Sequence, residues 1–77
     1  MIQLYTQPQC PPCEFLKNYL KNEGITYEEF NIKSDKQAMR RMMNDYDSFS
    51  TPTIIINEKA YTMHQFEEVE KLLSQLK

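Results

Sequence analysis

The sequence has few residues of the kinds that bind soft metal ions. Among its 77 residues are two cysteines, Cys10 and Cys13, and one histidine, His64. A structural zinc site takes four ligands, usually cysteine or histidine, so one chain alone does not supply a complete set. We therefore expect no bound metal in a single chain, although ligands shared between two chains remain an open alternative.

Clusters of basic residues and long apolar runs are also missing. The formal net charge is −2, and Arg40 and Arg41 are the only adjacent basic residues. This balance provides no electrostatic footprint for nucleic acid or an anionic membrane. No apolar run reaches the length of a membrane-spanning helix. We therefore expect neither nucleic acid nor a membrane as a partner.

The first residues lack the basic region, apolar run and small-residue cleavage site of a secretory signal. We expect a cytoplasmic, monomeric protein in which residues 1–77 form one domain. In a reducing compartment, a cysteine pair is more often catalytic or metal-binding than structural. A disulfide closing so short a loop would also stabilise the fold by only roughly 2 kcal/mol, so a purely structural bond is not favoured.

Hydrophobic patterns predict seven elements in the order β-α-β-α-β-β-α. The strands are expected at residues 2–6, 26–32, 53–57 and 59–61, and the first and third helices at about 11–23 and 63–76. The first β-α-β unit should be parallel and right-handed, and the last two strands should form an antiparallel hairpin. The fold class is therefore α/β, with a four-stranded mixed sheet flanked by three helices.

Capping residues predict where the helices begin and end. Ser34 with Gln37, and Thr62 with Gln65, have the spacing of capping boxes, while Gly24 is suited to end the first helix. Apolar stripes at helical spacing should pack in the core, with a methionine-rich binding surface as the alternative for the second helix. The stripe of the second helix comprises Ala38, Met39, Met42, Met43 and Tyr46. That of the third comprises Phe66, Val69, Leu72, Leu73 and Leu76.

The two cysteines are predicted to lie in different environments. Cys10 should be the N-cap of the first helix, where backbone N–H groups and the helix dipole favour the thiolate, the species that attacks disulfides. Cys13 should lie one turn later, on the side shared with Leu16 and Leu20. Cys10 is therefore the predicted nucleophile and Cys13 the buried resolving thiol. Placement at a helix start after a strand argues against two unreactive cysteines.

The residues between the cysteines remove two potential hydrogen-bond donors. Pro11 and Pro12 have no N–H, which leaves the N–H groups of Cys13 and Glu14 and the Cys13 thiol as local donors to the Cys10 sulfur. The fixed φ angles of two prolines stiffen the loop in both redox states. We expect a lowered pKa of the Cys10 thiol.

A second motif places a proline, Pro52, before the most buried predicted strand. Two motifs carry a resemblance to a known family: "LYT" leading to "CPPC", and "STPTIII". Essentially the whole chain resembles the thioredoxin superfamily in its smallest form, the glutaredoxins and the glutaredoxin-like redoxins of the NrdH-redoxin type. The resemblance implies a minimal thioredoxin fold, with a cis peptide bond before Pro52 that lies beside Cys10. The resemblance also implies that the backbone of Thr51 offers hydrogen bonds to an incoming substrate chain. The candidate substrate-binding residues are thus Thr51 and Pro52, together with Pro11, Pro12 and Tyr5, although Tyr5 could instead simply pack.

The resemblance also implies a thiol-disulfide oxidoreductase without a bound cofactor. The Cys10 thiolate would attack a protein or small-molecule disulfide, and Cys13 would resolve the mixed disulfide, with ribonucleotide reductase or a similar enzyme as one possible acceptor. Many glutathione-using glutaredoxins have a basic residue a few positions before the first cysteine, where this sequence has Gln7. They also have a Gly-Gly stretch after the last strand, where residues 61–65 of this sequence contain no glycine. The Trp-Ser-Gly-Phe segment typical of NrdH-redoxins is absent as well. Glutathione and a thioredoxin reductase are therefore both candidate external reductants.

Two other functions remain open. Cys10 thiolates from two chains, together with small thiols, could hold an iron–sulfur cluster. Alternatively, the chain could be an adaptor whose thiols are incidental. His64 could shuttle protons if it faced the dithiol, but we expect it to face solvent in the first turn of the third helix.

Overall fold

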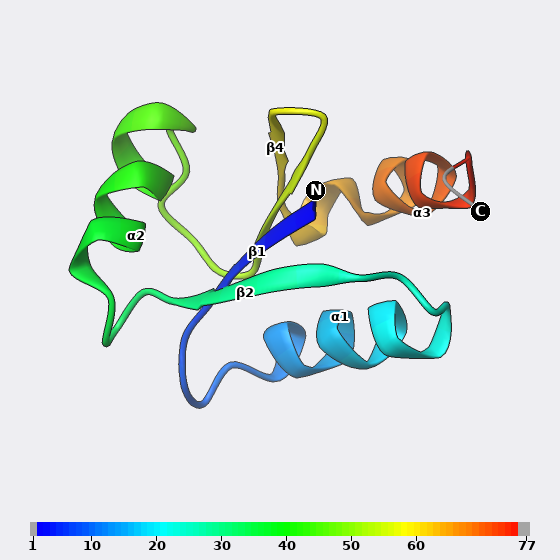
Figure 1. The fold of residues 1–77 in the computed structure, drawn as a ribbon, viewed down its shortest axis with the longest axis horizontal. Helices are drawn as coiled ribbons and strands as arrows, with labels where there is room; N and C mark the ends of the chain where they lie inside the picture. The colour runs from blue at the N-terminus through cyan, green and yellow to red at the C-terminus, as the bar shows by residue number, and fades with distance from the viewer. Residues whose placement is uncertain (1, 76–77) are drawn as a thin grey trace.

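The computed structural model describes residues 2–75, which contain a four-stranded sheet in the order β2-β1-β3-β4 (Figure 1). Strand β1 (Ile2–Thr6) pairs in parallel with β2 (Tyr27–Asn31) and antiparallel with β3 (Thr53–Ile56). Strand β3 also pairs antiparallel with β4 (Lys59–Tyr61). The predicted mixed sheet, with a parallel first unit and a closing antiparallel hairpin, is confirmed.

Helical segments connect these strands. Helix α1 (Pro11–Asn22) joins β1 to β2, and α2 (Lys36–Arg40) continues into a π-helical turn at Arg41–Asp45. A 3₁₀ turn at Met63–Gln65 leads into α3 (Phe66–Gln75). The predicted order of elements is therefore confirmed. Within the described residues, every helix is too short or too polar to cross a membrane.

The sheet separates two hydrophobic clusters, and α1 and α3 pack on the face opposite α2 (Figure 1). The larger cluster comprises Ile2, Leu4, Leu16, Leu20, Ile54, Ile56, Tyr61, Val69 and Leu73. The smaller comprises Tyr5, Ala38, Met42 and Ile55. Because successive strand residues point to opposite faces, the apolar run of β3 is buried on both sides, as its sequence predicts.

The turn residues adopt the conformations that their chemistry favours. Gly24 follows α1 with φ +70°, a left-handed conformation that costs glycine no steric clash. Asn57 and Glu58 turn the chain between β3 and β4 with φ values of 53° and 66°. Both predicted turns are confirmed.

The start of α2 differs from the prediction. Asp35 is the N-cap, and its Oδ1 accepts a hydrogen bond from the Ala38 N–H at 3.0 Å. The N–H and hydroxyl of Ser34 both donate to the Asn31 carbonyl, within the turn that follows β2. The predicted capping box of Ser34 with Gln37 is therefore wrong, because the turn uses the Ser34 side chain and the helix begins after Asp35.

One residue of the predicted stripe on the second helix is not in the core. Ala38 and Met42 are buried as predicted, whereas the Met39 side chain is 40% exposed. Successive α-helical residues are about 100° apart around the axis, so a short helix with Ala38 and Met42 inward turns Met39 away from the sheet. The prediction that Met39 packs in the core is therefore wrong. Leu76, predicted on the stripe of the third helix, lies outside the described residues.

Replacing Asp35 with alanine should lower the free energy of unfolding by about 1 kcal/mol, because the Ala38 N–H loses its capping acceptor. Urea unfolding followed by circular dichroism measures the change. Ser34→Ala, one residue earlier, is the matched control and should cost less than about 0.5 kcal/mol. An equal or larger loss in the control would contradict the assignment of Asp35 as the cap.

Candidate active site

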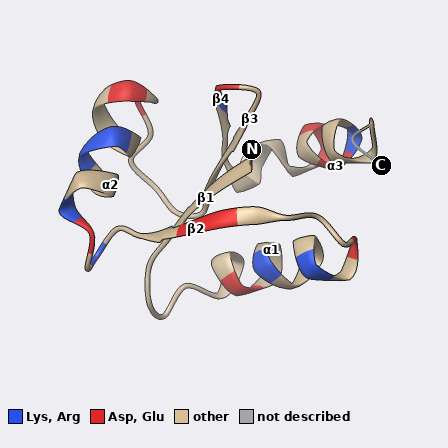
Figure 2. Cartoon of the chain, viewed as in Figure 1, with Lys and Arg blue, Asp and Glu red and all other residues tan. Residues whose placement is uncertain are grey.

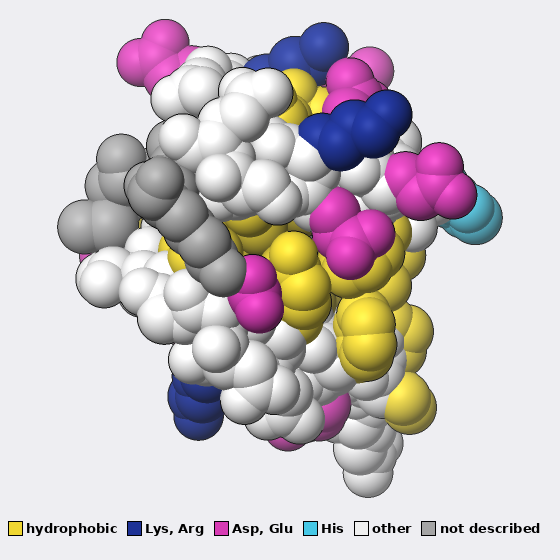
Figure 3. Space-filling view, turned by 90° about the vertical axis from the view of Figure 1, so that its right-hand side faces the viewer, with side chains coloured by type: hydrophobic (Ala, Val, Ile, Leu, Met, Phe, Trp, Pro, Cys, Tyr) yellow, Lys and Arg dark blue, Asp and Glu magenta, His cyan; other side chains and the backbone are white. Residues whose placement is uncertain are grey.

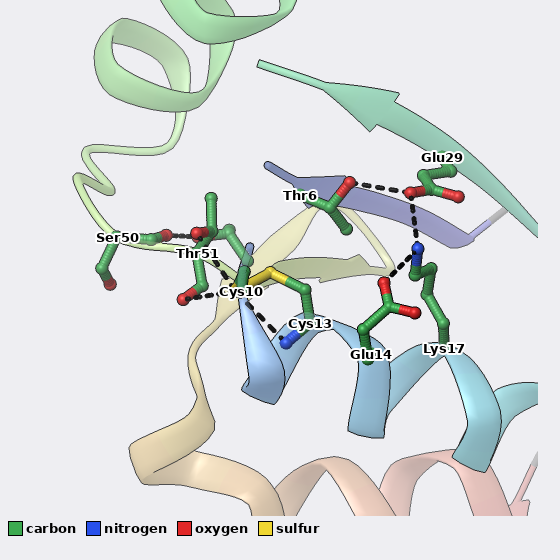
Figure 4. The surroundings of a disulfide bond; sticks show 9 residues. Thr6, Cys10, Cys13, Glu14, Lys17, Glu29, Ser50 and Thr51 are labelled. Carbon is green, nitrogen blue, oxygen red and sulfur yellow. Dashed lines mark hydrogen bonds and ion pairs between the residues drawn. A yellow bond between two sulfur atoms is a disulfide. The ribbon is translucent and has the colours of Figure 1, made fainter. Parts of the chain in front are cut away.

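The two cysteines form a disulfide at the start of α1, with their Cα atoms 5.2 Å apart (Figure 4). Cys10 is the N-cap of the helix, as predicted. Its residue remains 9% exposed, while Cys13 is completely buried on the side shared with Leu16 and Leu20. Cys10 is therefore the more accessible of the two residues.

Only one backbone donor from the first turn of α1 reaches the Cys10 sulfur. The Cys13 N–H donates to Cys10 Sγ at 3.3 Å. The Glu14 N–H, in contrast, donates to the Cys10 carbonyl at 3.1 Å and so belongs to the helix, which makes its predicted role as a sulfur donor wrong. Pro11 and Pro12 are exposed and provide no N–H. The prolines thus leave a single amide for the sulfur.

The loop before β3 supplies a second donor. Cys10 Sγ lies 3.6 Å from Thr51 Oγ1 and 3.9 Å from the Thr51 carbonyl oxygen. A disulfide sulfur carries no proton, so the Thr51 hydroxyl is the donor in this contact. The bond between Thr51 and Pro52 is cis, as the resemblance implied, and Pro52 is buried. Residues 41 positions apart are thus in contact at the disulfide.

Two buried hydroxyl groups hold this loop in place, and sequence reasoning missed both. The Thr53 hydroxyl donates to the Ser50 carbonyl at 2.6 Å. Its oxygen therefore accepts the hydrogen bond from the Ser48 hydroxyl, 2.7 Å away. Ser48 and Thr53 are 7% and 0% exposed. The serines and threonines around Pro52 were a signal that such a network could form.

A second polar network near the disulfide was also missed (Figure 4). The buried Thr6 hydroxyl donates to Glu29 Oε2 at 2.8 Å, and Lys17 Nζ lies 3.4 Å from the same oxygen. Lys17 Nζ is also 2.6 Å from Glu14 Oε2. The hydrogen bond to Glu14 and the charge of Glu29 raise the pKa of Lys17. The negative charge of Glu14, close to the start of α1, is therefore paired with a cation.

Tyr5 lies in the smaller hydrophobic cluster. It is fully buried, and its ring stacks on Phe30 with the centroids 5.3 Å apart. Arg41 Nε donates to the Tyr5 hydroxyl at 3.3 Å, and this hydrogen bond raises the pKa of Arg41. These contacts give Tyr5 a packing role, and its contact with substrate stays a prediction.

The single histidine lies on the surface. His64 is exposed in the turn at Met63–Gln65, which confirms that it faces solvent. Within residues 2–75, no group of three or more His, Cys, Asp or Glu side chains is placed to hold a metal ion.

Comparisons with known sequences find a family model and a relative of similar size. The family model described as Glutaredoxin matches residues 2–61. An uncharacterised glutaredoxin-like 8.6 kDa protein in the rubredoxin operon of Clostridium pasteurianum is 29% identical over 73 residues, which cover 95% of this chain and 97% of that protein.

Solved structures show the same architecture. The thioredoxin-like protein BC3987 is 44% identical, with a TM-score of 0.88 over 94% of this chain and 99% of that one. The glutaredoxin-like protein NrdH-redoxin from Escherichia coli has a TM-score of 0.79 at 20% identity, over 92% of each chain. The second likeness is one of fold alone. The thioredoxin-like fold implied by the resemblance is thus confirmed.

Replacing Thr51 with valine should raise the pKa of the Cys10 thiol in the reduced protein by about half a unit to one unit. Valine keeps the shape of threonine but cannot donate a hydrogen bond to the thiolate, and one pKa unit corresponds to about 1.4 kcal/mol. The pH dependence of Cys10 alkylation, followed by mass spectrometry of the labelled peptide, measures the pKa. Ser50→Ala, at an exposed neighbouring position, is the control and should leave it unchanged. An unchanged or lower pKa in Thr51→Val would show that the hydroxyl does not stabilise the thiolate.

Proposed function

Because the chain belongs to the glutaredoxin family, we propose that it is a thiol-disulfide oxidoreductase in which Cys10 attacks and Cys13 resolves. The observation that supports this assignment is the asymmetry of the pair. Cys10 retains exposure and accepts hydrogen bonds at its sulfur, while Cys13 is buried behind it. The more accessible cysteine is thus also the one whose sulfur has donors that favour a thiolate.

The proposed cycle exchanges two electrons without a bound cofactor. The Cys10 thiolate attacks one sulfur of the substrate disulfide, the other substrate sulfur leaves as a thiolate, and a mixed disulfide forms. Cys13 then loses its proton and attacks Cys10 Sγ, which releases the second substrate thiolate. The substrate is reduced, and the protein ends with the bond between Cys10 and Cys13 that the structure contains.

The surroundings of Cys10 support its role as nucleophile. The Cys13 N–H and the Thr51 hydroxyl both approach the sulfur, and a negative charge there would strengthen both hydrogen bonds. Cys10 also lies at the positive end of the dipole of α1. We expect these contacts to favour the Cys10 thiolate in the reduced protein, which is the species that attacks a disulfide.

We further propose that a thioredoxin reductase, not glutathione, reopens the disulfide. Residues 61–65 contain no glycine pair, and Gln7 stands where many glutathione-using relatives have a basic residue. The 44%-identical solved structure is itself described as thioredoxin-like. The acceptor that we propose is a protein disulfide, with ribonucleotide reductase or a similar enzyme as one candidate. Such chemistry suits a reducing cytoplasm, which is the location that we propose. We also propose that residues 1–77 act as a single domain and as a monomer.

Cys10→Ser should abolish reduction of a model protein disulfide such as that of insulin, because a serine hydroxyl does not displace a thiolate at neutral pH. Cys13→Ser should instead accumulate a mixed disulfide, because no second thiol releases the substrate. Intact-mass spectrometry under non-reducing conditions detects that adduct. Full turnover by Cys10→Ser would contradict the proposed function.

The reductant is tested separately on the oxidised protein. NADPH with thioredoxin reductase should reopen the bond between Cys10 and Cys13 at least about tenfold faster than glutathione at matched reducing capacity. Alkylation of the free thiols at timed intervals measures both rates. Faster reduction by glutathione would contradict the proposed reductant but would leave the oxidoreductase function intact.

A further inference from the structure

A surface groove lies between α2 and the loop that precedes Cys10. It has a volume of about 680 Å³. Its lining residues are Gln7, Pro8, Gln9, Ile32, Lys33, Lys36, Met39 and Arg40. Gln9, one of these residues, immediately precedes Cys10 in the chain, so the lining of the groove reaches the residue next to the disulfide. A molecule bound in the groove would therefore lie close to the turn that carries Cys10.

The groove gathers positive charge on a protein whose net charge is negative. Lys33, Lys36 and Arg40 are all exposed, and no acidic residue is among the eight that line the groove. The nearest carboxylate along the chain, that of Asp35, accepts the hydrogen bond that caps α2. Figure 2 shows the basic residues of α2 and of the turn before it, and the acidic residues in the middle of β2. The groove thus favours a partner that carries negative charge.

The groove also contains apolar surface. Met39 is 40% exposed, Pro8 is exposed and Ile32 is partly buried. Methionine is flexible and polarizable, so it adapts to different side chains at binding surfaces. Cations next to exposed apolar groups suit a polypeptide with both acidic and apolar side chains better than a small inorganic anion.

The spacing of two of the cations matches an extended chain. Lys36 and Arg40 are four residues apart in one short helical turn and so lie on the same side, about 6 Å apart along the axis. In an extended strand, alternate side chains on one face are about 6.6 Å apart. Carboxylates at alternate positions of an extended segment can therefore pair with these two cations together.

We propose that this groove binds an acidic, extended segment of the protein whose disulfide is reduced. The inference depends on the proposed oxidoreductase function and adds the class of substrate: a protein in which Asp or Glu residues at alternate positions flank the target cysteine. The segment lies along α2 and ends beside Gln9, which brings the target sulfur to Cys10. The side of the molecule in Figure 3 instead shows acidic, basic and hydrophobic side chains together.

Three synthetic peptides test the proposal. Each contains the same disulfide-closed loop, preceded by Asp-Ala-Asp-Ala-Asp, Ser-Ala-Ser-Ala-Ser or Lys-Ala-Lys-Ala-Lys, and each rate is divided by the rate with dithiothreitol, an uncharged dithiol. The wild-type protein should reduce the acidic peptide at least about tenfold faster than the basic peptide at low ionic strength. This ratio should fall as salt is added, because salt screens exposed charges.

Charge reversal in the groove provides the decisive comparison. The double variant Lys36→Glu with Arg40→Glu should favour the basic peptide. The control, Lys21→Glu with Lys71→Glu, changes the net charge equally at exposed positions of α1 and α3 and should keep the wild-type preference. Circular dichroism of both variants checks that they are folded.

The outcomes separate this inference from the proposed function. If the wild-type protein reduces none of the peptides, the proposed function fails. If it reduces all three at equal normalised rates, or if both double variants lose the preference equally, the acidic-segment proposal is wrong. The proposal is also overturned if the groove variant slows only reduction of the oxidised protein by glutathione and keeps the wild-type peptide preference, since the cations would then serve a small tripeptide.

Discussion

Burial of the two central strands on both faces is the constraint on which the rest of the structure depends. Strands β1 and β3 need helices on both sides of the sheet, and three short helices meet that need. Because the two strands are antiparallel, the end of β1 lies beside the start of β3, with Tyr5 paired to Thr53. The loop after Tyr5 leads to Cys10, and the loop before Thr53 carries Thr51. Their contact thus follows from the strand pairing.

The prolines between the cysteines change the source of the hydrogen bonds to the sulfur. A helix start normally offers several free N–H groups, but here Pro11 and Pro12 remove two, and the helix itself uses that of Glu14. One amide and the Thr51 hydroxyl remain at Cys10. Part of the hydrogen bonding to the sulfur therefore comes from a loop that is distant in sequence and not from α1.

Much of the fold could be predicted from local patterns, and the errors have physical causes. Alternation, β-branched runs and turn residues predicted the four strands, helical periodicity predicted the first and third helices, and the strand-to-helix position of Cys10 predicted its capping role. Ser34 and Asp35 are both good caps, so only the geometry of the preceding turn decides between them. The exposure of Met39 depends on which residues of its helix face the sheet, and these are Ala38 and Met42. The hydrogen bond from Thr6 to Glu29 and the groove could not be predicted, because each is formed by segments that come together only when the sheet folds.

The acidic edge of the sheet has a consequence for how the protein meets extended chains. Strand β2 exposes Glu28 and Glu29, and β4 at the opposite edge is only three residues long. Charged or very short edges discourage the addition of another strand, which is how unfolded chains and sheets aggregate. A reductase of the proposed kind, acting on extended polypeptides, would gain from such edges, because its sheet would not become a template on which they assemble.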